Sequence, residues 1–323
     1  LASGSQPIDD FVFRVTPTTA EPYDKVMVMP GNKAWSTSSP ITVDVTSAAD
    51  RKTHNMLTIY RSDSSGSPIF GFSLGGGANI IADGDGTGTQ YDDLVITQFN
   101  SPQTVFIVKG RPVSGDQTLT LTSTLSGAGT GDTTTVALRL DGETGSKAPQ
   151  DPVIVSFDGD GIPDLMFAHA PGNAAIWLYW VRGKSITASL GKVTVLQSSV
   201  VSGVSGLRKH TMGYAVSTYA YPLRSAGNFL DQSGTGAIAI AYSQASYGPT
   251  GRTRVSIRAP LLRASGTGNE PSYHVEDLSI EHPFAAGSKD FGSFNFRSIG
   301  DVNGDGHPDL LVGTYSGYAV LIY

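Results

Sequence analysis

The sequence contains no cysteine, which excludes disulfide bonds, thiolate catalysis and a sulfur-ligated metal site. Charged side chains are sparse, at 15% of 323 residues, and the formal net charge is -6. No cluster of lysine and arginine is present, so the chain lacks the basic surface that nucleic-acid binding requires. The longest apolar run, Ala174 to Val181, is too short to cross a bilayer as a helix. We therefore expect no nucleic-acid partner and no transmembrane segment.

Glycine is abundant, at 39 residues, and 39% of the chain is apolar. The apolar residues occur in short alternating or β-branched runs, and no amphipathic helical pattern extends beyond two turns. This composition predicts an all-β fold with many turns and a substantial core.

The most informative motif is an acidic loop near the end of the sequence. Its oxygen donors alternate along the chain, which is the arrangement that Ca²⁺ requires: the side chains of Asp301, Asn303, Asp305 and Asp309, and the backbone carbonyl of His307. Gly306 supplies the tight turn. Unlike an EF-hand, the loop leads directly into an apolar strand that begins at Leu310. The motif therefore predicts a calcium site that joins two strands.

The same motif recurs along the chain, with starts roughly 70 to 75 residues apart. A second copy places its donors in the same order: Ser156, Asp158, Asp160, the carbonyl of Ile162, and Asp164. A lengthened third copy has Asp83 and Asp85, and is closed by Asp92 or Asp93, of which Asp93 is the expected ligand. In an eroded fourth copy, which begins at Asp231, Ser233 and Thr235 replace carboxylates. We expect two to three Ca²⁺ sites. Whether the fourth copy binds metal stays undecided.

The intervals between the loops each hold about four short strands, which is the content of one β-propeller blade. After the third copy, for example, the expected strands are Leu94–Thr97, Thr104–Val108, Thr118–Ser123 and Thr134–Leu140. A first blade without an acidic loop comprises Lys25–Met29, Ile41–Val45, Met56–Tyr60 and Ile69–Leu74. The sequence thus predicts a single propeller domain over residues 1–323, with four-stranded antiparallel blades. Five blades are expected, or six or seven if the long connections hold further strands, and Phe11–Val15 is expected to complete the last blade.

These residues resemble the FG-GAP repeats of integrin α-chain-type propellers and the related bacterial VCBS-type repeats. The resemblance is carried by Phe291-Gly292, Ile299 to Gly306 and Asp309 to Gly313, and more weakly by Asp158 to Phe167. Repeats fall near 83–97, 156–168, 231–242 and 301–314. The resemblance implies calcium loops on one face of the disc that mainly stiffen it. It further implies a secreted, periplasmic or cell-surface protein that binds a glycan or a cell-surface protein.

Residues outside the acidic loops suggest two further kinds of site. Trp35 lies in a loop without apolar periodicity and is a candidate ligand contact. The strand that carries Tyr179 and Trp180 is either an aromatic sugar platform or part of the core. Arg208, His210 and Tyr214 offer a base and a cation for β-elimination on an acidic polysaccharide, or form a solvated basic turn. The function therefore stays open between a binding module, an extracellular polysaccharide lyase or glycosidase with its site at the propeller channel, and an architectural propeller.

Overall fold

The structure is a computed structural model. It describes residues 10–17, 23–31, 42–61, 69–80, 91–99, 104–121, 136–142, 147–156, 161–170, 177–183, 192–196, 207–211, 223–227, 239–247, 252–258, 260–263, 270–273, 278–281, 291–314 and 319–323. This part of the chain is almost entirely β-structure, and its one helix, α1 (Ala48–Thr53), has six residues. No helix in it is long and apolar enough to span a membrane. The expected all-β class is confirmed.

The first two sheets are built from the N-terminal half of the chain. The order of the first sheet is β1 (Phe11–Val15), β2 (Lys25–Met29), β3 (Leu57–Arg61) and β7 (Gln117–Leu121). The order of the second is β12 (Lys192–Leu196), β8 (Val136–Gly142), β6 (Thr104–Val108), β5 (Asp93–Phe99) and β4 (Ile69–Ala78). Neighbours within each sheet are antiparallel except at one edge, where β7 runs parallel to β3 and β12 parallel to β8.

The remaining sheets follow in chain order. The third contains β13 (Leu207–Thr211), β11 (Trp177–Val181), β10 (Asp164–Ala170) and β9 (Lys147–Val155). The fourth contains β14 (Leu223–Gly227), β15 (Ala239–Tyr247), β16 (Arg252–Arg258) and β19 (Leu278–Glu281). A hairpin of β17 (Pro260–Arg263) and β18 (Glu270–Tyr273) precedes the last sheet, which contains β20 (Phe291–Ser298), β21 (Leu310–Thr314) and β22 (Ala319–Ile322).

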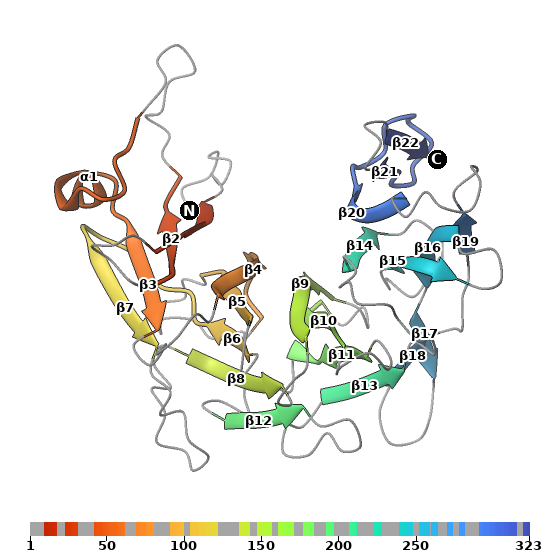
Figure 1. Cartoon of the computed structure of the whole chain (residues 1–323), viewed down its shortest axis with the longest axis horizontal. Helices are drawn as coiled ribbons and strands as arrows, with labels where there is room; N and C mark the ends of the chain where they lie inside the picture. The colour runs from red at the N-terminus through yellow and green to blue at the C-terminus, as the bar shows by residue number, and fades with distance from the viewer. Residues whose placement is uncertain are drawn as a thin grey trace.

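The sheets stand one after another in an arc, as the blades of a propeller do (Figure 1). The strands β4, β9, β14 and β20 lie on the inner side of the arc, and β7, β8, β12 and β13 on the outer side (Figure 1). The first three sheets bury apolar faces against each other, because alternate residues of each strand point to the same side. Val26, Ile59 and Phe106 belong to the core between the first and second sheets. Val95, Leu165 and Tyr179 belong to the core between the second and third. This arrangement is β-propeller-like.

The expected closure by the N-terminal strand is not formed. Phe11–Val15 pairs antiparallel with Lys25–Met29 in the first sheet, and in the described part of the chain β22 pairs only with β21. The first and last sheets stand at the two ends of the arc (Figure 1). The local partner in β2 satisfies the backbone of β1 at a smaller cost in loop entropy than a distant sheet would.

Two further expectations about the strands are wrong in detail. The run predicted as Thr118–Ser123 does not join the blade of its sequence neighbours: β7 extends the first sheet instead, and β12 likewise extends the second. The outer edge strand of the first sheet and that of the second therefore come from a later segment of the chain. Each runs parallel to its neighbour, so these two sheets are not purely antiparallel. Residues 42–45 of the predicted strand Ile41–Val45 are not in a strand, and a turn at Val45 and Thr46 precedes α1. Asp44 initiates this turn, because its carboxylate accepts hydrogen bonds from both the amide and the hydroxyl of Thr46.

Candidate functional site

The acidic loop near the C-terminus connects β20 to β21 and is shaped by glycine. Gly300, Gly304 and Gly306 have φ angles of 79°, 80° and 93°. Residues with a side chain rarely adopt this left-handed backbone conformation, so these glycines permit three tight reversals within one short loop. Asp309 closes the loop, because its amide donates to the Gly300 carbonyl at 2.8 Å and its carbonyl accepts from the Ile299 amide at 3.0 Å. The prediction that the loop joins two strands is confirmed.

The carboxylates of this loop point inward onto its own backbone. Asp301 Oδ1 accepts from the amides of Gly304 at 2.6 Å and Asp305 at 3.0 Å, and Asp301 Oδ2 accepts from the Gly306 amide at 2.8 Å. The side chain of Asn303 donates to Asp305 Oδ2 at 2.8 Å and accepts from the Asp305 amide at 3.0 Å. The His307 amide and then the Asn303 side chain hold the pKa of Asp305 below its usual range. Asp305 therefore stays ionised and acceptor-only near neutral pH.

Asp309 differs from the other acidic residues of the loop because it is fully buried. Its Oδ2 accepts from the Val302 amide at 2.7 Å, whereas its Oδ1 has no hydrogen-bond partner among the described residues. A buried carboxylate oxygen without a donor is costly, and a cation at this point would remove the cost.

Asp93 and Asp164 occupy the same position in their sheets as Asp309. Each directly precedes a leucine that pairs with the end of the next strand: Leu94 with Val108, Leu165 with Val181, and Leu310 with Ile322. All three aspartates are buried, at 1% exposure or less. The register thus identifies one repeated position, which we call the buried aspartate position, and it selects Asp93 over the exposed Asp92.

At two of these positions the carboxylate accepts a hydrogen bond from a glycine just beyond the paired strand. The amides of Gly110 and Gly183 donate to Asp93 Oδ1 and Asp164 Oδ1, each at 2.9 Å. A Cβ on Gly110 would lie 2.5 Å from the carbonyl oxygen of Asp92, and one on Gly183 would clash with the carbonyl oxygen of Pro163. Glycine is required because the backbone approaches the residue before the aspartate so closely.

The loop that begins at Ser156 uses the same turn as the loop that begins at Asp301. The amide of Gly161 donates to Ser156 Oγ at 3.1 Å, as the amide of Gly306 donates to Asp301. Gly161 also has a positive φ, of 82°, as Gly306 has. The two loops therefore match at the first donor residue and at the turn glycine. Asp158 and Asp160 lie outside the described residues, as do Asp83 and Asp85 of the third loop.

The donor set of the loop from Asp301 to Asp309 fits calcium in its chemistry. It consists of oxygen atoms only, it includes three carboxylates, and it retains one buried carboxylate oxygen without a donor. Each carboxylate oxygen has two lone pairs, so one backbone hydrogen bond still leaves it able to bind a cation. In the described part of the chain, however, no three His, Cys, Asp or Glu side chains are gathered around one point as metal ligands would be. A cation at this loop would therefore have to draw its ligands together.

The residues of the catalytic hypothesis lie on or after an outer strand. Arg208 and His210 belong to β13, where they pair with Trp180 and Leu178. Their segment is therefore a strand and not the basic turn that was the alternative interpretation. β13 is the edge of its sheet opposite to β9, whereas β9 lies on the inner side of the arc (Figure 1). Tyr214 lies outside the described residues. This placement gives no support to an active site at a central channel.

Two aromatic residues of β11 belong to the core. Tyr179 and Trp180 are each 1% exposed, and the Tyr179 ring stacks on Phe167 with centroids 5.4 Å apart. The core interpretation is thus confirmed for these two residues. Trp35 lies outside the described residues.

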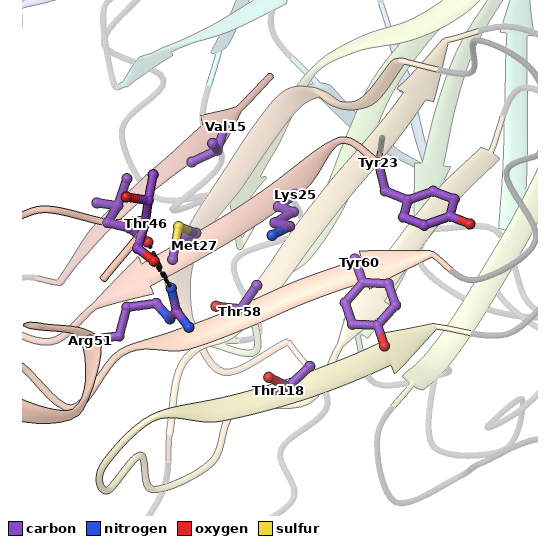
Figure 2. A pocket seen from close by; sticks show the side chains of 10 residues that line it. Val15, Tyr23, Lys25, Met27, Thr46, Arg51, Thr58, Tyr60 and Thr118 are labelled. Atoms are coloured by element: carbon purple, nitrogen blue, oxygen red, sulfur yellow. Dashed lines mark hydrogen bonds between the residues drawn. The ribbon is translucent and has the colours of Figure 1, made fainter. Parts of the chain in front are cut away.

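The structure also contains a cavity of about 410 Å³ that the sequence did not predict, on the face of the first sheet away from the second sheet. Strands β1, β2, β3 and β7 form its floor, and the segment around α1 forms one end (Figure 2). It is lined by Val15, Tyr23, Lys25, Met27, Val45, Thr46, Arg51, Thr58, Tyr60 and Thr118. The sequence pattern that could have indicated this cavity is the alternation along β2, where Lys25 and Met27 face the cavity and Val26 faces the core.

The fold and the loops define the chain as an all-β protein of propeller-like sheets with glycine-shaped acidic turns. Comparison with protein families agrees with this class: residues 298–323 match the family model described as FG-GAP repeat. The match covers the last residue of β20, the whole β20–β21 loop, β21 and β22, and it includes Asp301 and Asp309. No curated protein matches the chain.

Proposed function

We propose that this chain is an extracellular, calcium-stabilised β-propeller module that binds a glycan or a cell-surface protein. The observation that carries the proposal is the FG-GAP repeat at residues 298–323, set in an arc of blade-like sheets. FG-GAP repeats suggest an integrin-like binding module. The cavity on the first sheet adds a concave surface with cationic, aromatic and hydroxyl groups.

Calcium has a structural role in this proposal. Asp301, Asn303, Asp305 and Asp309 would hold the ion together with the carbonyl of His307, and the loop that begins at Ser156 would hold a second. A bound ion supplies a strong positive charge that offsets the repulsion between carboxylates. The chain contributes the positive-φ glycines and the backbone amides, which keep the carboxylates turned into the loop. The β20–β21 connection would thereby be fixed relative to the strands that follow it.

The extracellular location is part of the proposal, and the same loop chemistry supports it. The donors Asp301, Asn303 and Asp305 are exposed, and their loop has no preformed ligand cluster, so we expect weak affinity. Weak calcium modules, with Kd values of about 10⁻⁴–10⁻³ M, are filled outside cells, where the ion is plentiful. The absence of cysteine and of any Asn-x-Ser/Thr sequon is compatible with a bacterial secreted or periplasmic protein.

A binding array tests the proposal directly. The chain of residues 1–323 is applied, in calcium-containing buffer, to arrayed glycans and cell-surface proteins, and we expect saturable binding to a defined subset. The same preparations are incubated with acidic and neutral polysaccharides, and reducing ends and unsaturated products are followed. Turnover that is lost on His210→Ala, or the absence of any saturable partner, would overturn the binding module.

A further inference from the structure

We propose that the chain forms a two-fold symmetric dimer in which the edge strand β22 of the last sheet pairs antiparallel with β22 of a second copy. This assembly goes beyond the proposed binding function and does not depend on it. Among the described residues, the four larger sheets have four or five strands each, whereas the last sheet has three, with β22 at its edge. The edge of β22 therefore lies where the other sheets continue.

The buried aspartate position shows which strand the last sheet lacks. Leu310, next to Asp309, pairs with Ile322 at the end of β22. The leucines that follow Asp93 and Asp164 pair in the same way with the ends of β6 and β11. In this register β22 corresponds to β6 and β11, and each of those carries a further antiparallel strand, β8 on β6 and β13 on β11. A strand of a second copy would occupy the same place on β22, in the same direction.

The side chains of β22 are less covered than those of the corresponding strands. All five residues of β6 are buried, and the last three residues of β11 are each 1% exposed or less. None of the four residues of β22 is buried. On the neighbouring strand β21, Leu310 and Val312 are fully buried on one face, while Leu311 on the other face is 38% exposed. An added strand would cover apolar surface that the last sheet leaves partly open, which is favourable in water.

β22 also lacks the features that normally protect an edge strand. Exposed edges usually carry charged side chains, proline or a bulge, which discourage pairing with another chain. Edge strands of the four larger sheets carry polar or charged side chains, such as Lys192 on β12, Arg208 on β13, Glu281 on β19, and Thr118 and Thr120 on β7. In contrast, β22 consists of Ala, Val, Leu and Ile, and its register with β21 is uninterrupted. Its composition is that of a strand paired on both sides.

A second copy of the chain offers an edge that matches. Two identical strands that pair antiparallel are related by a two-fold axis, so the interface is closed and each copy supplies the same surface. No residue from 310 to 323 is charged, so no like charges of the two β21–β22 hairpins face each other.

The antiparallel direction also separates the acidic loops of the two copies. Ile322 pairs with Leu310, the residue that directly follows the loop, so the loop of each copy lies at the Ile322 end of its β22. Antiparallel pairing places these two ends far apart. Parallel pairing would bring the exposed Asp301 and Asp305 of both copies to the same end, where they would repel each other. The charge distribution therefore favours the two-fold arrangement.

Sedimentation velocity measures the assembly of the chain of residues 1–323 over about a hundredfold range of concentration. We expect a reversible equilibrium between monomer and dimer. Hydrogen exchange should show that the amides of β22 that do not bond to β21 become protected as the concentration rises. A chain that stays monomeric, or that grows into larger oligomers, would overturn the proposal. Protection of these amides already in dilute solution would also overturn it, since a segment of the same chain would then cover the edge.

Leu321→Lys is the decisive variant, and Leu311→Lys is its control. The two leucines are paired across β22 and β21 and lie on the same face of the sheet, but only Leu321 belongs to the edge strand. The first change places two like charges near the two-fold axis and should raise the dissociation constant of the dimer about tenfold. The second lies one strand further from the axis and should change it by less than about twofold. Far-UV circular dichroism and the melting temperature show whether each variant is folded. A dimer that responds equally to both variants, or to neither, would place the interface elsewhere.

Discussion

At the scale of single residues, the buried aspartate position is repeated along the chain with the same burial and the same strand register. Asp93 and Asp164 each bind the amide of a distant glycine, and Asp309 is buried in the same register. The carboxylates of Asp93 and Asp164 therefore fix the start of one strand to the end of the next. The exposed carboxylates, such as Asp301 and Asp305, shape the loop that leads to this point.

Asp93→Ala tests this role against its neighbour Asp92→Ala. The first change leaves the Gly110 amide without its acceptor, so we expect the free energy of unfolding to fall by about 1–3 kcal/mol. The second removes an exposed side chain and should change it by less than about 0.5 kcal/mol. Urea denaturation measures both. Equal effects from the two alanines would show that the buried carboxylate contributes nothing specific.

Asp44 provides a prediction about pH. The hydroxyl of Thr46, at 2.6 Å, and then its amide, at 2.9 Å, hold the pKa of Asp44 below its usual range. Since the folded-state pKa is the lower one, the stabilisation by Asp44 is present above the unfolded value of about 4 and is lost as pH falls through the folded value. Thr46→Val should raise the pKa of Asp44 in an NMR titration of its carboxyl carbon. An unchanged titration curve would exclude the hydroxyl as the main cause.

The sequence predicted which residues form the acidic loops better than it predicted their burial and their hydrogen bonds. The alternation of donors from Asp301 to Asp309 could be read directly, and so could the turn glycine Gly306. Asp93 was the expected ligand of the third loop, but its burial could not be read from the sequence, because it depends on which side chain the sheet covers. Gly110 and Gly183 could not be recognised either, since their role arises from a close backbone approach between segments that are distant in the sequence.

At the scale of strands and sheets, the positions of strands were more predictable than their partners. Phe11–Val15, Lys25–Met29 and Thr104–Val108 were predicted with the bounds that the structure has. Their local apolar alternation reports which residues lie in strands. The parallel addition of β7 to β3 was not predicted, because pairing depends on contacts that no local pattern encodes. The cavity on the first sheet was missed for the same reason, since it needs β2, β3, β7 and the α1 segment together.

A buried polar contact between two sheets gives a prediction at this scale. Arg61, from β3, donates to Gln98 Oε1 on β5 at 2.6 Å, and its guanidinium lies 5.8 Å from the centre of the Phe106 ring. Arg61 is 5% exposed and Gln98 is fully buried. We expect Arg61→Ala and Gln98→Ala to be non-additive, with a coupling energy of about 0.5–3 kcal/mol in a double-mutant cycle.

The control for this cycle pairs Arg61→Ala with Asp305→Ala, in the loop between β20 and β21. The sheet that contains these two strands stands at the other end of the arc (Figure 1). These two changes should add within about 0.5 kcal/mol, because distant sites without a shared partner are independent. Additivity in both cycles would mean that Arg61 and Gln98 do not connect the first sheet to the second.

At the scale of the whole molecule, the chain is a series of small sheets arranged in an arc, and the first three bury their faces against one another (Figure 1). The all-β class and the FG-GAP motif could be predicted because repeated loops have a local signature, and residues 298–323 match that family model. The expected closure through Phe11–Val15 was wrong, because β1 pairs with the nearby strand β2 instead. In the described part of the chain, β1 and β22 are therefore edges of the first and last sheets.

Calcium-dependent thermal unfolding is the most direct measurement of how the loops stabilise this arc. The melting temperature of the chain is recorded in calcium, in magnesium and in EDTA, for the native sequence and for Asp301→Asn combined with Asp305→Asn. We expect calcium to raise it, since a ligand at 100 times its Kd stabilises the folded state by about 2.7 kcal/mol. Magnesium should have a smaller effect, and the variant should lose much of the calcium-dependent shift. The same melting temperature in calcium and in EDTA for the native sequence would contradict calcium stabilisation.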